Sequence, residues 1–213
     1  MKKPYISDAV IRRLPRYYRY LDYLESKGHT RISSVLLGKK MDLTASQIRQ
    51  DINCFGNFGQ QGYGYNISEL KTEISHILGA DNLRRLIVIG AGNLGHALLQ
   101  SFDFAQCGFE VGCIFDVSPS LIGTSICDIP VRSTEDLDAY CAEFHPEVAV
   151  LTVPQCVSRA TARRIVSLGV NGIWNFTNME LGVENDVCVE NVHFADSLLT
   201  LSYQISQKQD AEQ

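Results

Sequence analysis

The residues best suited to a specific chemistry are three glycines within the segment 90–95, which reads Gly-Ala-Gly-Asn-Leu-Gly. An apolar, β-branched run at 86–89 precedes the segment and a helical pattern follows it, so the glycines lie between a predicted strand and a predicted helix. In that setting the first glycine permits a tight turn, the second lets the backbone approach a pyrophosphate, and the third allows the helix to pack closely on the strand. The predicted dinucleotide-binding residues are Gly90, Ala91, Gly92, Asn93, Leu94 and Gly95.

A carboxylate at the end of the next predicted strand supports the same chemistry. That strand covers residues 111–115 and is followed by Asp116, roughly 20 residues after Gly95, where an acidic side chain binds the ribose hydroxyls of an adenine nucleotide. Segment 117–131 contains no Lys or Arg that would neutralise a 2′-phosphate. Because Asp116 would also repel that phosphate, we expect the cofactor to be NAD(H) rather than NADP(H).

The elements around this loop alternate between strand and helix. Predicted strands at 148–153 and 172–176 are separated by a helical pattern at 159–168. This order indicates an α/β fold class with a Rossmann-type, doubly wound parallel sheet. Val153 and Pro154 lie at the end of a strand, where the loops of such sheets face their ligand, so we expect both to contact the cofactor.

A second group of residues suits base recognition on DNA. Thr44 and Gln47 fit a capping box, and the helix that they open carries Ile48 and Ile52 inward with Phe55 beyond them. The opposite face presents side chains that can hydrogen-bond to bases in the major groove, since Arg pairs with guanine and Gln or Asn pairs with adenine. These predicted DNA-binding residues are Ser46, Gln47, Arg49 and Gln50, with Asn53 on the same face. On spacing alone, the alternative is that these polar side chains form an ordinary solvent-exposed helix face that contacts no DNA.

The surrounding elements favour base recognition over that alternative. A helical pattern at 11–24, ended by Gly28, and a short helix after Ser33, ended by Gly38, precede the recognition helix. Alternating glycine and aromatic residues at 55–65 then predict a β-hairpin, which completes a winged helix-turn-helix. The hairpin contains Gln60 and Gln61, and the predicted phosphate-binding residues include Arg13, Arg16 and Arg31.

The charge of the chain is divided between two segments of opposite sign. The net charge of −5 over 213 residues, taken whole, argues against a nucleic-acid partner. Residues 1–80, however, carry 12 Lys and Arg against 7 Asp and Glu, whereas residues 81–213 carry 7 against 17. The sequence therefore predicts a basic module for a polyanion and an acidic module with another task.

Several classes of protein are not supported by the composition. No apolar run approaches the roughly 18 residues that span a bilayer, and the N-terminal residues lack the apolar stretch of a secretory signal, so we expect a cytoplasmic protein with no membrane partner. The seven cysteines are odd in number and include no Cys-x-x-Cys pair, which predicts neither a disulfide framework nor a metal site. Most of these thiols are expected to be buried.

The sequence also leaves open a different class of protein, an enzyme. A dehydrogenase needs a proton donor or acceptor near the nicotinamide, and no Lys lies between Lys71 and Lys208. Among the histidines of the acidic half, His96 and His145 fit a helix and a surface turn, which leaves His193 as the candidate base. The runner-up hypothesis is therefore a small NAD-dependent oxidoreductase with a basic dimerisation module.

Characteristic residues occur in the stretches 11–21, 31–34, 47–49, 55–59, 90–95, 115–119, 122–123, 151–154 and 174–176. Through these stretches the sequence resembles the Rex family of redox-sensing transcriptional repressors over nearly its whole length. The resemblance implies a homodimer that binds a palindromic operator when NADH is low and releases it when NADH rises relative to NAD+. It also implies that a C-terminal helix at 193–207 is exchanged between subunits, which places Phe194 near the partner's nicotinamide site.

This sequence departs from the family pattern at residues that affect DNA affinity and the coupling between cofactor binding and DNA binding. Gln60, Gln61 and Gln50 stand where the family usually has basic residues, which predicts a weaker dependence of DNA binding on salt. Ser101 and His193 stand where members often have Tyr and Asp, residues linked there with a counterpart of Arg19 to the coupling of cofactor and DNA. A Rex-like paralogue with weakened coupling is thus a further alternative, and the histidine predicts a pH-dependent response.

The expected division is a winged-helix DNA-binding domain at 1–80, a Rossmann NAD(H)-binding domain at 81–192, and the exchanged helix with its tail at 193–213.

Overall fold

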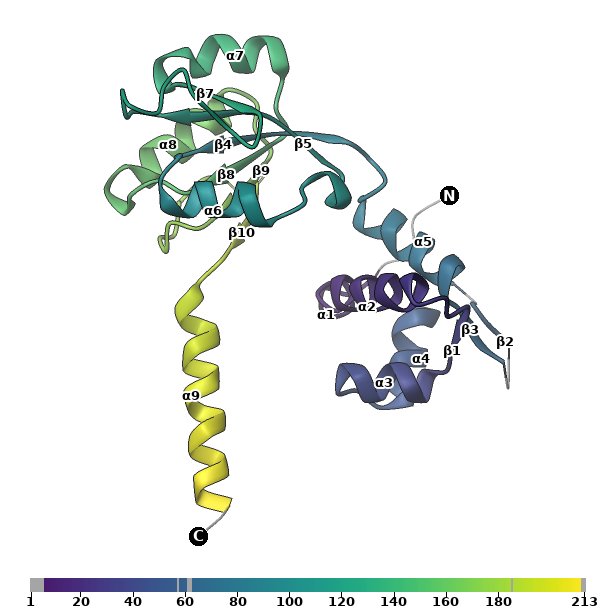
Figure 1. Ribbon diagram of the computed structural model, residues 1–213. Helices are drawn as coiled ribbons and strands as arrows, with labels where there is room; N and C mark the ends of the chain where they lie inside the picture. The colour runs from purple at the N-terminus through teal and green to yellow at the C-terminus, as the bar shows by residue number, and fades with distance from the viewer. Residues whose placement is uncertain (1–5, 57, 61–62, 185, 212–213) are drawn as a thin grey trace. The chain divides into compact units, whose positions relative to one another are not determined.

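A computed structural model describes residues 6–56, 58–60, 63–184 and 186–211. The chain divides into two compact units, Met1–Asn82 and Leu83–Gln213 (Figure 1). Each unit has its own buried apolar side chains, one cluster in the first unit and two in the second.

The first unit combines a helix-turn-helix with a small antiparallel sheet. The strands occur in the order β1-β3-β2, and β2 and β3 form the hairpin that the glycine–aromatic alternation predicted. Its elements are α1 (Asp8–Ile11), α2 (Leu14–Ser26), β1 (Arg31–Ile32), α3 (Ser34–Met41), α4 (Ala45–Asn53), β2 (Gly59–Gln60), β3 (Gly64–Asn66) and α5 (Ile67–Leu78).

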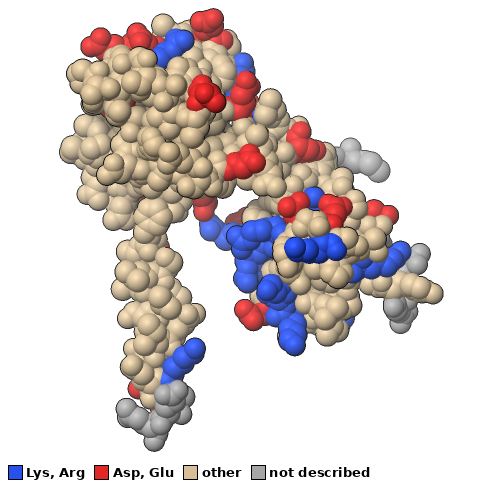
Figure 2. All heavy atoms as spheres, viewed as in Figure 1, with Lys and Arg blue, Asp and Glu red and all other residues tan. Residues whose placement is uncertain are grey.

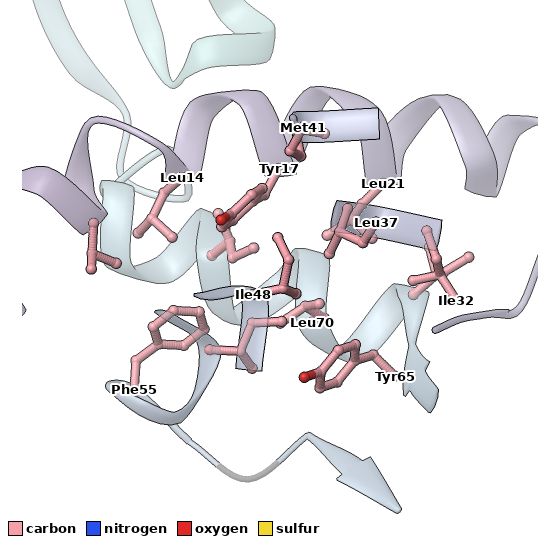
Figure 3. Close-up of a cluster of buried hydrophobic side chains, with 14 residues drawn as sticks. Leu14, Tyr17, Leu21, Ile32, Leu37, Met41, Ile48, Phe55, Tyr65 and Leu70 are labelled. Carbon is pink, nitrogen blue, oxygen red and sulfur yellow. The ribbon is translucent and has the colours of Figure 1, made fainter. Parts of the chain in front are cut away.

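The core of this unit lies between α2, α4 and α5. Figure 3 shows Leu14, Tyr17 and Leu21 of α2 pointing toward Ile48 of α4 and Leu70 of α5. Leu14, Leu21, Ile48 and Leu70 are fully buried, as expected for an apolar stripe at helical spacing. This packing fixes α4 with its opposite face in solvent.

Two predictions about the early helices were wrong. The pattern at 11–24 is divided between two helices, because α2 begins at Leu14 with Pro15 in its first turn. Gly38 does not end α3 but lies inside it, where a Cβ would come within 2.5 Å of the carbonyl oxygen of Leu43. The glycine therefore serves the close approach of α3 to the turn before α4.

The second unit is a seven-stranded sheet in the order β10-β9-β8-β4-β5-β7-β6, parallel except for the β6–β7 hairpin. Helix α6 packs with one buried cluster, whereas α7 and α8 pack with the other, so helices cover both faces (Figure 1). The elements are β4 (Arg84–Ile89), α6 (Asn93–Ser101), β5 (Phe109–Asp116), β6 (Ser125–Ile126), β7 (Ile129–Ser133), α7 (Leu137–Phe144), β8 (Val148–Leu151), α8 (Gln155–Ser167), β9 (Gly172–Asn175), β10 (Cys188–Asn191) and α9 (Phe194–Ala211).

The strand order reverses between β4 and β8, which is where ligands bind in open α/β sheets. Strand β8 ends two residues earlier than predicted and α8 begins four residues earlier, so Val153 and Pro154 lie in the loop between them. That loop follows the carboxyl end of β8, beside the glycine loop that follows β4.

The last helix, α9, exposes its apolar residues. Phe194, Leu198, Leu201 and Ile205 are each at least half exposed, at the i, i+4, i+7, i+11 spacing of one helical face. The helix begins after His193, not at it, and extends beyond the predicted residue 207. Such an uncovered stripe is typical of an interface.

The prediction that most cysteines are buried was wrong. Cys113 and Cys141 are buried, but Cys127, Cys156 and Cys188 are exposed. Burial raises the pKa of the Cys113 thiol to about 11, which keeps it protonated and unreactive. Within the described part of the chain, no helix is both long and apolar enough to cross a bilayer, and no three His, Cys, Asp or Glu side chains are grouped to hold a metal ion.

Candidate functional site

A cavity of about 890 Å³ lies at the point where the strand order reverses. This volume is in the range of sites that hold cofactors and drug-sized ligands. The predicted cofactor-binding residues on its wall are Gly90, Gly92, Leu94, Asp116, Val153 and Pro154. Ala91, Asn93 and Gly95 belong to the same loop and helix start, whereas Phe194 does not line the cavity.

The glycine loop is held closely against the neighbouring strand. Gly90 has a φ of 103°, a conformation that favours glycine, and the Thr152 hydroxyl donates to its carbonyl oxygen at 2.8 Å. A Cβ on Gly95 would collide with the same carbonyl. The first and third glycines are thus required by packing within the unit.

Gly92 has a different role at the start of α6. It is the N-cap residue, and a Cβ there would meet no atom within 4 Å. Because glycine has no side chain to accept a hydrogen bond, the first N–H groups of α6 have no side-chain cap, unlike those of α3, α4 and α5. An anionic group such as a pyrophosphate fits this helix terminus.

Asp116 connects the glycine loop to the end of β5. Its Oδ2 accepts a hydrogen bond from the Ala91 N–H at 2.6 Å, and its Oδ1 accepts one from the Ser118 N–H at 2.8 Å. The carboxylate still lines the cavity, where the remaining lone pairs of its oxygens can accept ribose hydroxyls. Arg164, a cationic residue on the wall, is paired with Asp138 at 2.6 Å.

Sequence reasoning missed other parts of the cavity wall. Thr152, Phe176 and Thr177 follow the ends of β8 and β9, and α8 contributes one of its faces. Their position immediately after parallel strands was the available signal, since all such ends meet at one edge of the sheet. Phe176 also contacts Phe194, with 6.1 Å between ring centroids, which places the start of α9 next to a residue of the cavity wall.

The exposed face of α4 agrees with the pattern predicted for base recognition. Ser46, Arg49, Gln50 and Asn53 surround a shallow hollow of about 420 Å³. The Arg49 guanidinium donates to the Ser34 hydroxyl at 3.2 Å. The Gln47 side chain accepts from the Thr44 N–H at 2.9 Å in the predicted capping box, which is confirmed.

The predicted phosphate-binding arginines divide into two groups. Arg13 donates two hydrogen bonds of 2.7 Å to the buried Asp51, and Arg16 donates to the Met41 carbonyl at 3.4 Å. Arg31 is exposed on β1. Lys and Arg side chains gather over α2 and α3 of the first unit (Figure 2). Gln61 and the side chain of Gln60 lie outside the described residues.

The three predicted coupling residues are Arg19, Ser101 and His193. Arg19 is exposed on α2 and lines a hollow of about 340 Å³ with Tyr20, Tyr23 and Lys40. Ser101 is exposed at the end of α6. His193 lies just before α9, and its Nδ1 is 2.9 Å from the Oδ1 of Asn178.

A basic helix-turn-helix unit joined to a dinucleotide-type cavity defines a class, the transcription regulators that respond to a nucleotide ligand. Segment 5–53 matches the family model "Putative DNA-binding protein N-terminus", and segment 81–179 matches "CoA binding domain". The chain belongs to the Rex family of redox-sensing transcriptional repressors, which its close relatives establish.

One such relative is the redox-sensing transcriptional repressor Rex of Caldanaerobacter subterraneus subsp. tengcongensis, 47% identical over 98% of this chain and 93% of its own. The crystal structure of RSP with β-NADH is similar with a TM-score of 0.90 at 43% identity, over 97% of each chain. The structure of RSP with β-NAD+ and operator DNA has a TM-score of 0.88 at 46% identity, over 98% of this chain and 96% of that one. The protein is therefore a repressor, and the oxidoreductase hypothesis was wrong.

Proposed function

We propose that this protein represses transcription by binding operator DNA in the cytoplasm, and that a rise of NADH relative to NAD+ releases it. The observation that carries this proposal is the near full-length similarity to RSP both with NADH and with NAD+ and operator DNA. The open cavity of the second unit and the exposed polar face of α4 are the two surfaces that this function needs.

The cofactor site in this proposal is the cavity at the strand reversal. The N-terminus of α6 binds the pyrophosphate, and Asp116 binds the ribose hydroxyls of the adenosine half. Asp116 also disfavours a 2′-phosphate, so NAD(H) is preferred over NADP(H). The residues assigned to the cofactor are Gly90, Ala91, Gly92, Asn93, Leu94, Gly95, Asp116, Val153, Pro154 and Phe194.

The DNA site in this proposal is the exposed face of α4 and its surroundings. Arg49 and Gln50 read base edges in the major groove, and the hairpin contacts the backbone beside it. The assigned residues are Ser46, Gln47, Arg49 and Gln50 on α4, Arg16 and Arg31 for phosphates, and Gln60 and Gln61 in the hairpin. Arg13, whose guanidinium is paired with the buried Asp51, is not among them.

A homodimer with exchanged α9 helices completes the proposal. The exposed apolar face of α9, from Phe194 to Ile205, needs a cover, and a second copy of the chain supplies one. Exchange brings Phe194 beside the nicotinamide of the partner. The functional division is then a DNA-binding domain at 1–80, a cofactor domain at 81–192 and an exchanged segment at 193–213, and the dimer matches a palindromic operator.

Release by NADH requires that NADH bind the DNA-incompetent dimer more tightly than the competent one. We assign this coupling to Arg19, Ser101 and His193. The hydrogen-bond contact of His193 with Asn178, two residues beyond the cavity residue Phe176, supports its place in the coupling.

The test is an anisotropy titration of a palindromic DNA selected by the full-length chain, with NADH and NAD+ in competition. Saturating NADH is expected to lower operator affinity by about 5- to 150-fold relative to saturating NAD+, the usual range of coupling energies. Equal operator affinity under both cofactors would reject the redox response and leave a Rex-like DNA-binding protein without coupling.

Gln50→Lys is expected to strengthen DNA binding at low salt, because it adds a positive charge to the exposed face of α4. The slope of log affinity against log salt concentration should steepen by about 0.9 for one added phosphate contact. A fluorescence titration at several salt concentrations measures the slope. Gln106→Lys, on the other unit, is the control and should leave it unchanged; an unaltered slope for both variants would remove α4 from the interface.

A further inference from the structure

A buried carboxylate joins the recognition helix to α2. Asp51 is 4% exposed and lies on the inner face of α4. Its Oδ1 accepts from Arg13 Nη2 at 2.7 Å, and its Oδ2 accepts from Arg13 Nε at 2.7 Å and from the Tyr17 hydroxyl at 2.6 Å. Both oxygens thus have partners, which are Arg13, the N-cap residue of α2, and Tyr17, four residues later.

Burial of this carboxylate destabilises the fold unless its cationic partner and its hydrogen-bond donors are all present. Removing a carboxylate from water carries a large penalty, which only a paired cation and satisfied hydrogen bonds offset. The hydrogen bond to Asp51 raises the pKa of Arg13, and burial, followed by the same carboxylate, raises that of Tyr17, so both donors keep their protons near neutral pH. The network therefore holds a single geometry rather than several.

The geometry of these hydrogen bonds restricts the rotation of α4, and that rotation sets where its base-reading side chains point. A guanidinium forms two parallel bonds to a carboxylate only when the two groups are nearly coplanar. Asp51 directly follows Gln50, so the orientation of this carboxylate fixes the direction in which Arg49 and Gln50 leave the helix. Apolar contacts through Ile48 and Ile52 hold α4 against the core, but they do not select one rotation as sharply.

We propose that Arg13, Asp51 and Tyr17 are positioning residues that orient α4 for base recognition, and that Arg13 does not bind a DNA phosphate. The proposal rests on the DNA-binding function proposed above. It replaces the assignment of Arg13 from its charge alone, because the guanidinium is already paired with a buried carboxylate.

The test compares operator DNA with unrelated DNA in the full-length chain. Asp51→Asn and Arg13→Gln are each expected to lower operator affinity about tenfold or more, because each removes hydrogen bonds to a buried charge. Affinity for unrelated DNA, which needs only phosphate contacts, and the salt slope are both expected to stay unchanged. The double variant should bind no more weakly than the weaker single variant.

Tyr17→Phe keeps the buried ring and removes one donor, so it should show a smaller loss of specificity in a folded protein. If Asp51→Asn does not fold, the operator affinity of Tyr17→Phe alone tests the proposal. Gln50→Lys shows that the salt slope responds to one charge. The proposal is overturned if Arg13→Gln reduces the slope by about 0.9, as a lost phosphate contact would, or if Tyr17→Phe and Asp51→Asn bind operator like the unmodified chain.

Absence of DNA binding by the unmodified chain would reject the proposed function but not this positioning role. Hydrogen exchange of the α4 amides then decides it. Tyr17→Phe accelerates that exchange if the carboxylate network holds the helix, and an unchanged exchange rate rejects the role.

Discussion

Replacing Gly95 by alanine is expected to abolish NADH binding and to destabilise the Leu83–Gln213 unit. The new Cβ would collide with the carbonyl oxygen of Gly90, a backbone atom that cannot move without displacing the loop from β8. Such overpacking typically costs about 1–3 kcal/mol, and contact with backbone places this site at the upper end of that range. Thermal unfolding measures the loss, and the melting transition should fall by several degrees.

Gly92→Ala is the matched control for this prediction. A Cβ there meets no atom within 4 Å, and the φ of Gly92, −65°, is open to any residue. Stability should therefore be unchanged, while NADH affinity is expected to fall because the methyl group would stand at the proposed pyrophosphate site. A Gly95→Ala protein that melts and binds like the Gly92→Ala protein would contradict the packing role.

Binding of NADH in both variants can be followed through Trp174, the only tryptophan of the chain. Its ring lies 4.7 Å, between centroids, from that of Phe176, which lines the cavity. Because tryptophan emission overlaps the absorption of reduced nicotinamide, bound NADH should quench it.

A double substitution, Leu198→Glu with Leu201→Glu, is expected to give a monomer that binds operator about a thousandfold more weakly. Two carboxylates on the exposed stripe of α9 would have to be buried in a dimer, at a cost that exceeds the gain from the remaining contacts. A monomer engages one half-site and loses the effective concentration that links the two halves of a palindrome. Sedimentation equilibrium gives the mass, and anisotropy gives the affinity.

Gln204→Glu adds a charge to the same helix outside the apolar stripe and should leave the dimer intact. It controls for a general effect of acidic residues on DNA affinity, since the net charge of the chain is already negative. A double variant that remains dimeric would show that α9 is not the interface.

The local elements of both sites could be predicted from the sequence, because their signals are local. The capping box of Thr44 and Gln47 and the glycine spacing between β4 and α6 depend on neighbouring residues only. The hairpin between β2 and β3 follows from alternating glycine and aromatic residues.

The partners of individual side chains could not be predicted in the same way. Arg13 and Asp51 are 38 residues apart, and nothing in their local pattern distinguishes an arginine paired with a buried carboxylate from one that faces phosphate. Thr152 and Phe176 join the cavity only because parallel strands bring their ends to one edge. The break between α1 and α2 was missed because a helical face at 11–24 continues across it.

The uncapped start of α6 has a consequence for the lifetime of the protein. An anionic ligand can accept hydrogen bonds from the first N–H groups of a helix that lacks a side-chain cap. Bound dinucleotide should therefore raise the free energy of unfolding of the Leu83–Gln213 unit, in addition to setting the DNA-binding state of the protein. At a ligand concentration one hundred times the dissociation constant, this contribution is about 2.7 kcal/mol. Depletion of the nucleotide pool would then expose the empty protein to proteolysis, and the amount of repressor would follow the supply of its cofactor.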